Sequence, residues 1–136
     1  MVLAPSILIV DDDPKTAELI DRFLSKEGFR TSRAADGGTA IDTFAAVGPD
    51  LVILDVMLPK VDGFEVCAVI RRTSKVTILF LTVRTEEADL VLGLGLGADD
   101  YVEKPFSPRE LVARAKRRFS LHGRALELTA IGFTLL

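Results

Sequence analysis

The sequence is poor in the residues on which disulfide-rich folds and many metal sites depend. Its 136 residues include one cysteine, Cys67, one histidine, His122, and no tryptophan. A single cysteine cannot form an intrachain disulfide, and one cysteine with one histidine cannot form a zinc cluster. We therefore expect no soft-metal site, and we expect Cys67 to be a small core residue.

Long hydrophobic segments and a leader peptide are also missing. The apolar runs are far too short to cross a bilayer, so no membrane partner is expected. The start, MVLAPSILIVDDDP, lacks the basic flank and cleavage site of a secretory signal, which predicts a cytoplasmic location. A net charge of −3 argues against general binding to nucleic-acid backbones, although residues 114–119 are locally basic.

Short apolar runs instead alternate with amphipathic segments along the chain. Strands are expected at 6–10, 29–35, 51–55, 76–82 and 101–106, and helices at 14–27, 38–47, 63–73, 85–96 and 107–119. Asp13 and Ser107 are the expected N-caps of the first and last helices, each followed by a proline. Because the central strands are apolar throughout, they should lie in a parallel sheet that is covered on both faces. The predicted fold is α/β: a doubly wound, flavodoxin-like sheet of five parallel strands in the order 2-1-3-4-5, with helices on both faces.

Polar residues follow the expected strands at the ends where ligands bind in such sheets. They are Asp11 and Asp12 after the first strand, Asp55 ending the third, Thr82 ending the fourth and Lys104 after the fifth. Turn formation does not explain this set, because lysine and threonine have no special role in turns. We therefore expect three carboxylates, a hydroxyl and an ammonium to meet in one crevice.

Three neighbouring carboxylates repel one another, and Lys104 supplies only one compensating charge. A hard divalent cation, Mg²⁺ or Mn²⁺, would cancel the remainder if carboxylates, a main-chain carbonyl and water bound it. The crevice could then accept a phosphoryl group whose oxygens are shared among the metal, the ammonium, the hydroxyl and backbone N–H groups. Asp55 is then placed to be the nucleophile, and an aspartyl phosphate would result.

Four segments together resemble the receiver domain of bacterial two-component response regulators, over about residues 6–118. They are ILIVDDDP, LVILDVMLPKVDGFEV, LFLTVR and GADDYVEKPFSPRELVARAK. The resemblance implies a signalling phosphoacceptor rather than a turnover enzyme. Its partner would be a sensor histidine kinase, which would transfer a phosphoryl group onto Asp55 in a magnesium-dependent reaction.

The resemblance also assigns the metal ligands. Asp12 corresponds to a direct ligand and Asp11 to a ligand through water. Asp55 contributes as well, and the carbonyl of Met57 corresponds to the main-chain ligand.

A second group of residues corresponds to the switch of the receiver family. Thr82 and Lys104 match the pair that senses the phosphoryl group, and Tyr101 matches the switch aromatic. A cis peptide is expected between Lys104 and Pro105. Phosphorylation would draw Thr82 towards the acceptor, Tyr101 would turn inward, and the face formed by the fourth helix, fifth strand and fifth helix would change shape.

The segment GADDYVEKPFSPRELVARAK is most similar to the receivers of winged-helix transcription factors, in which that face forms a two-fold dimer. The corresponding residues here are Leu90, Leu94, Asp99, Asp100, Glu110 and Arg114. Leu90 and Leu92 stand where that subfamily usually has basic residues, which implies fewer salt bridges and more apolar surface. Val83 stands where a small residue is usual, so access to the acceptor could be narrower.

Residues 1–119 are the expected receiver domain, and the tail at 120–136 resembles the truncated start of a winged-helix effector. A hydrophobic tail that packs locally or pairs with a neighbour is an equally good interpretation. An intact DNA-binding regulator is an alternative, but no recognition helix follows the receiver segments, so direct DNA binding by this chain is not expected.

The main alternative is a small phosphatase of the haloacid-dehalogenase type. In that family a nucleophilic aspartate follows a strand, and a second aspartate lies two residues later. Asp11 and Asp13 would fill these places. The chain is short for that family, however, and Asp55 would have no role in it.

Overall fold

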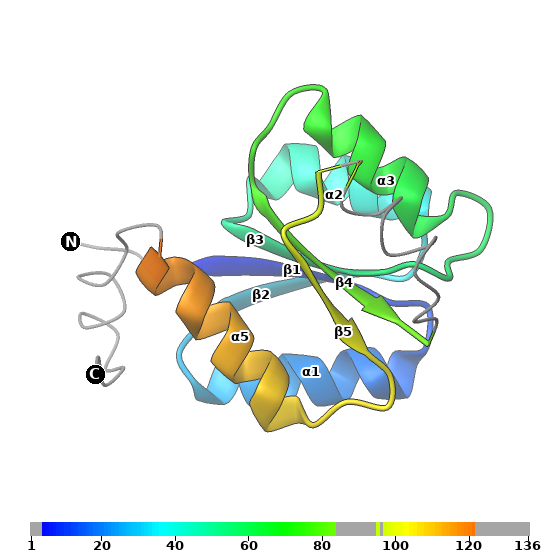
Figure 1. The fold of residues 1–136 in the computed structure, drawn as a ribbon. Helices are drawn as coiled ribbons and strands as arrows, with labels where there is room; N and C mark the ends of the chain where they lie inside the picture. The colour runs from blue at the N-terminus through cyan, green and yellow to red at the C-terminus, as the bar shows by residue number, and fades with distance from the viewer. Residues whose placement is uncertain (1–3, 84–94, 96, 122–136) are drawn as a thin grey trace.

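The five predicted strands form one parallel sheet. The structure, a computed structural model, describes residues 4–83, 95 and 97–121. The strands are β1 (Ser6–Val10), β2 (Arg30–Ala34), β3 (Leu51–Asp55), β4 (Thr77–Thr82) and β5 (Asp100–Glu103). Their order is β2-β1-β3-β4-β5, which confirms the predicted topology (Figure 1).

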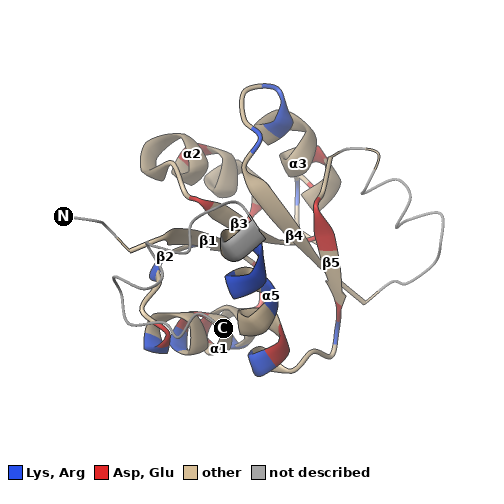
Figure 2. Cartoon of the chain, turned by 60° about the vertical axis from the view of Figure 1, so that its left-hand side comes forward, with Lys and Arg blue, Asp and Glu red and all other residues tan. Residues whose placement is uncertain are grey.

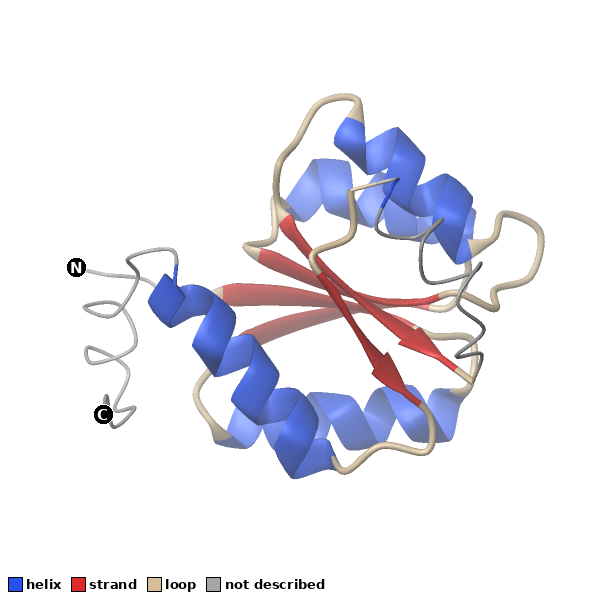
Figure 3. Cartoon of the chain, in the orientation of Figure 1, coloured by secondary structure: helices blue, strands red, loops and turns tan. Residues whose placement is uncertain are grey.

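The described helices cover both faces of this sheet. They are α1 (Pro14–Lys26), α2 (Gly37–Val47), α3 (Gly63–Arg71) and α5 (Pro108–Leu121). Helices α1 and α5 lie side by side on one face, and α2 and α3 on the other (Figures 1 and 3). The helix predicted at 85–96, with Leu90, Leu92 and Leu94, lies outside the described residues except at position 95, and so does the tail at 122–136.

Local signals set the helix starts where the sequence predicts them. The side chain of Asp13 accepts a hydrogen bond from the main-chain N–H of Lys15, and Pro14 occupies the first turn of α1. Helix α5 begins at Pro108, directly after the predicted cap Ser107. The predicted strand at 101–106 is shorter than expected and ends at Glu103. Proline at position 105 has no N–H to donate to a strand ladder, which limits how far β5 can extend.

The core has two parts because successive side chains of each buried strand point to opposite faces of the sheet. Ile7 and Ile9 of β1 pack towards α1 and α5, whereas Leu8 and Val10 pack towards α2 and α3. Cys67 is fully buried in the second part, as predicted. Among the described helices, none combines the length and apolarity needed to span a bilayer.

Candidate functional site

Three aspartates meet at the carboxyl edge of the sheet. Asp55 is the last residue of β3, and Asp11 and Asp12 directly follow β1, its neighbour in the sheet. Carboxylate oxygens of all three lie within 4.8 Å of one another. Parallel strands end at the same edge, so this convergence follows from the fold, as the sequence predicted.

Lys104 joins the two buried carboxylates. Its ammonium donates to Asp55 Oδ2 at 2.9 Å and to Asp11 Oδ2 at 3.0 Å. The other oxygen of each carboxylate accepts from a main-chain N–H two residues on, that of Met57 for Asp55 and that of Asp13 for Asp11, both at 2.9 Å. Each carboxylate is therefore held at both oxygens.

Burial and charge act against each other at this site. Burial raises the pKa of Asp55, and the negative charge of Asp11 adds to the increase, while the hydrogen bonds from Lys104 and Met57 oppose it. Burial alone would lower the pKa of Lys104, but its hydrogen bonds to Asp55 and Asp11 outweigh that effect and raise it. The hydrogen bonds and positive charge around Asp55 therefore do not fully offset the cost of burying its negative charge.

The donor set fits a hard divalent cation. Three carboxylates against one ammonium give a formal charge of −2 when all are ionised. Asp11 and Asp55 are buried, whereas Asp12 is exposed, so the cluster has a closed side and a side that faces solvent. Oxygen ligands with this charge are those that Mg²⁺ or Mn²⁺ would take. Asp11, Asp12 and Asp55 could therefore hold such an ion.

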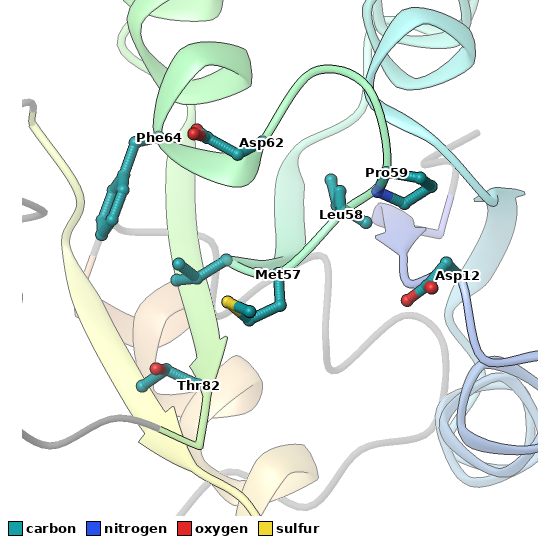
Figure 4. A pocket seen from close by; sticks show the side chains of 8 residues that line it. Asp12, Met57, Leu58, Pro59, Asp62, Phe64 and Thr82 are labelled. Atoms are coloured by element: carbon teal, nitrogen blue, oxygen red, sulfur yellow. The ribbon is translucent and has the colours of Figure 1, made fainter.

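A cleft of about 650 Å³ opens beside the aspartates (Figure 4). Its lining is mostly apolar: Asp12, Val56, Met57, Leu58, Pro59, Asp62, Phe64 and Thr82. Thr82 is buried at the end of β4 and contributes its side chain to this cleft, while Val83 beyond it is exposed. Of the three clustered aspartates, Asp12 lines this cleft, together with the residues that directly follow Asp55.

The loop between β3 and α3 is held tightly against the end of β3, which the sequence reasoning missed. The N–H of Gly63 donates to the carbonyl of Val56, and a Cβ at position 63 would lie 2.8 Å from the Cα of Val56. Lys60, in the same loop, has a φ of 67°. The only sequence signal for this close approach was the pair Asp62–Gly63 at the start of α3.

Among the residues assigned to the switch and dimer face, Asp100 and Tyr101 lie on β5, and Glu110 and Arg114 lie on α5. Tyr101 is partly buried on the α2–α3 side of the sheet, and the peptide between Lys104 and Pro105 is cis, as expected. Asp100 of β5 pairs within the chain with Arg114 of α5 at 2.8 Å. Figure 2 shows the acidic residues of β5 in red and the basic residues of α5 in blue.

Two further charges of that face differ in their surroundings. Glu110 is exposed, 4.0 Å from Arg114. Asp99 instead points towards α3, where Arg71 lies 3.1 Å from its carboxylate. In this structure Asp99 therefore makes contacts inside the chain.

Comparison with known proteins gives one consistent result. Residues 7–116 match the model of the response regulator receiver domain. The DNA-binding response regulator MtrA of Mycolicibacterium smegmatis is 52% identical over 112 residues, which are 82% of this chain and 49% of that protein. The chain thus spans about half the length of the curated relatives it matches.

Solved structures agree. A putative response regulator from Chloroflexus aurantiacus is 38% identical with a TM-score of 0.80, over 86% of this chain and 98% of that one. DrrB of Thermotoga maritima, described as an OmpR/PhoB homologue, is 32% identical with a TM-score of 0.78, over 88% of this chain and 54% of that one.

The phosphatase alternative finds no support. Asp13 caps α1, and its carboxylate accepts from the Lys15 N–H and the Thr16 hydroxyl instead of joining the aspartate cluster. The cluster is built around Asp55, for which that alternative had no role. The resemblance seen in the sequence is confirmed, and the chain belongs to the response regulator receiver family.

Proposed function

We propose that the chain accepts a phosphoryl group on Asp55 from a sensor histidine kinase in the cytoplasm. The observation that carries this proposal is the setting of the Asp55 carboxylate at the end of β3. It is buried, oriented by Lys104 and the Met57 N–H, and adjacent to two further carboxylates. A carboxylate fixed in this way is a preorganised nucleophile.

In the transfer, an oxygen of Asp55 forms a bond to phosphorus while the bond from phosphorus to the leaving group breaks. The leaving group is the imidazole of the kinase histidine or the acetate of acetyl phosphate. Lys104, which now donates to Asp55, can donate to a phosphoryl oxygen instead and stabilise its charge. The hydroxyl of Thr82 is the second expected partner of the phosphoryl group.

Magnesium would be held by Asp11, Asp12, Asp55 and the carbonyl of Met57. When bound, it supplies positive charge that offsets the negative charge of the acceptor and of the incoming phosphoryl group. Without it, the excess negative charge of the cluster opposes the approach of an anionic donor.

The expected output is a change in the face that contains β5 and α5. Thr82 would move towards the phosphoryl group, Tyr101 would turn inward, and two chains would then associate through this face. In a longer protein of the kind that the DNA-binding relatives represent, such pairing would control transcription. Residues 1–119 would serve as the receiver domain and the segment from 120 as the start of an effector.

Mass spectrometry of the intact chain tests the phosphorylation directly. After treatment with acetyl phosphate and Mg²⁺, one phosphoryl group should be added to the wild type and none to Asp55→Asn. Asp13→Asn is the matched control, since it removes a neighbouring carboxylate that caps α1, and it should still be labelled. Chelation should abolish labelling. Equal labelling of Asp55→Asn and the wild type would refute the proposal.

Sedimentation tests the output. We expect beryllofluoride with Mg²⁺ to shift the chain from monomer to dimer. The shift should depend only weakly on salt concentration, because positions 90 and 92 are leucines here, where the related receivers usually have basic residues. A monomer under all conditions would contradict dimerisation through this face. Dimerisation through this face would also be contradicted if the dimer is lost when only residues 120–136 are removed.

A further inference from the structure

Arg71, at the end of α3, is bonded through all three of its guanidinium nitrogens. Nε donates to the carbonyl of Gly97 at 2.9 Å, and a terminal nitrogen donates to Asp99 Oδ2 at 3.1 Å. The other terminal nitrogen donates to the carbonyl of Ser74 at 3.3 Å. The planar fork of arginine suits such a set of fixed acceptors. The side chain is 19% exposed, so these bonds are largely shielded from water.

The residues that Arg71 holds lie at the entry to β5. The N–H of Asp99 donates to the carbonyl of Ile78 at 3.0 Å, and the Asp99 carboxylate accepts from the N–H of Ile78 at 2.8 Å. Gly97 has a φ of 98°, and a Cβ there would lie 2.8 Å from Arg71 Nε. Arg71 therefore packs on the glycine and joins the entry of β5 to the end of α3, while Asp99 joins it to the start of β4.

Helix α5 holds the same stretch from the opposite face of the sheet. Arg118 donates to the carbonyl of Asp99 at 2.7 Å, and Arg114 donates to Asp100 Oδ2 at 2.8 Å and to the Tyr101 carbonyl at 3.4 Å. We call Arg71, Arg114 and Arg118 the arginine bracket. In the described sheet β5 is a four-residue edge strand bonded only to β4. The bracket fixes the start of this strand from both helical layers.

The other end of β5 leads to the aspartate cluster. The N–H of Lys104 donates to the carbonyl of Thr82 at 2.7 Å, and its ammonium reaches Asp55. A phosphoryl group on Asp55 would therefore pull on one end of a short edge strand. If the other end were loose, the strand could shift as a whole and Tyr101 would keep its surroundings.

We propose that Arg71 is a positioning residue for the response to phosphorylation, an inference that rests on the proposed function. By holding Gly97 and Asp99 it keeps the main chain at the start of β5 in place. The signal from Asp55 then appears as a rearrangement of the Tyr101 side chain and not as a displacement of the strand. Arg71 touches neither the phosphoryl group nor its metal, and it acts only through β5.

The intrinsic fluorescence of Tyr101 reports on its own surroundings, because the chain has one tyrosine and no tryptophan. We would measure tyrosine fluorescence while beryllofluoride and Mg²⁺ are added to the wild type, Arg71→Met and Arg72→Met. Arg72 is the matched control, since it is the adjacent arginine and its side chain is exposed. In Arg71→Met the fluorescence change at saturation should fall by about threefold or more, a size typical of residues that couple two sites. Arg72→Met should respond as the wild type does.

Labelling of Asp55 and urea unfolding are measured on the same samples. Arg71→Met should label as the wild type does, because the bracket is remote from the acceptor. If Arg71→Met does not fold, two other variants replace it. Arg71→Lys keeps the positive charge without the planar fork, and Asp99→Asn keeps an acceptor for the N–H of Ile78. A wild-type fluorescence change in the folded, labelled variants overturns this inference alone. A wild type that takes no label at Asp55 overturns the proposed function and this inference with it.

Discussion

Lys104 Nζ lies 2.9 Å from Asp55 Oδ2 and so connects the end of β5 to the end of β3, across 49 residues of sequence. The same ammonium lies 3.0 Å from Asp11 Oδ2. One cation thus stabilises two buried carboxylates, with Asp12 beside them. The stability of the site and its chemistry both depend on how this charge is balanced.

Replacement of Asp55 by asparagine should stabilise the fold near neutral pH. Burial raises the pKa of Asp55 above its ordinary 3.8, so the folded chain binds this proton more tightly than the unfolded chain does. The contribution of Asp55 to stability is then greatest below the unfolded pKa and is lost as pH rises through the folded pKa. The asparagine side chain cannot ionise, so the gain in Asp55→Asn should shrink as pH falls through the raised folded pKa and should be smallest once pH is below the unfolded value of 3.8. Thermal unfolding of both proteins in chelator, from neutral pH to below pH 3.8, measures this gain in stability. An Asp55→Asn variant less stable than the wild type at neutral pH would contradict the raised pKa of Asp55.

Lys104→Ala should lose stability, because two buried carboxylates would face each other without their cation. Breaking a fully buried pair costs about 3–5 kcal/mol, and for the partly exposed Lys104 we expect roughly 2 kcal/mol in chelator. Mg²⁺ should recover more stability in this variant than in the wild type. Lys75→Ala, at an exposed lysine, is the control for urea unfolding.

The wild type offers an independent check on Lys104. Since the pKa of Lys104 is raised above 10.5, its contribution is intact below that pH and is lost as pH rises through the folded value. A Lys104→Ala variant as stable as the wild type at neutral pH in chelator would contradict the account.

Gly63→Ala should disrupt the site through the backbone. A Cβ at position 63 would lie 2.8 Å from the Cα of Val56, and main-chain atoms cannot move aside as a flexible side chain can. We expect a loss of about 3 kcal/mol or more, as for severe overpacking. In Gly38→Ala the new Cβ would be 3.5 Å from Asp36 Oδ1, so urea unfolding should show little change or a small gain. Equal effects of the two substitutions would exclude a special role for Gly63.

Lys60→Gly should stabilise the loop that follows the acceptor. Lys60 has a φ of 67°, a conformation that costs a residue with a side chain about 1–2 kcal/mol, partly offset by the flexibility of glycine in the unfolded chain. A net gain of roughly 0.5–1 kcal/mol is expected in urea unfolding. Gly48 has a φ of 61° with open space around it, so Gly48→Ala should cost about 1 kcal/mol for the same reason. Shifts of the same sign in both variants would contradict this reasoning.

Much of the fold and of the aspartate cluster could be predicted from sequence because the signals are local. Buried strands such as Leu51–Asp55 are continuous apolar runs, and in a parallel sheet their polar last residues must meet at one edge. Asp13 could be separated from the cluster by its place before Pro14, at the cap of a helix.

Contacts between distant segments could not be predicted in this way. The carboxylate of Asp99 lies against Arg71, 28 residues earlier in the chain. The place of Asp99 at a dimer face stays a prediction. Nothing in the local pattern distinguishes an aspartate that faces solvent from one that binds an arginine of another helix. The close approach of Gly63 to the end of β3 depends on the path of the loop, which the sequence alone does not specify.

The position of the phosphoryl group on the chain can be measured directly. After treatment with acetyl phosphate and Mg²⁺, borohydride reduction converts an aspartyl phosphate to homoserine, and peptide mass spectrometry then locates the changed residue. If Asp55 is the phosphoacceptor, homoserine appears at position 55 alone. Homoserine at position 11, 12 or 13, or no conversion at all, would contradict the assignment of Asp55.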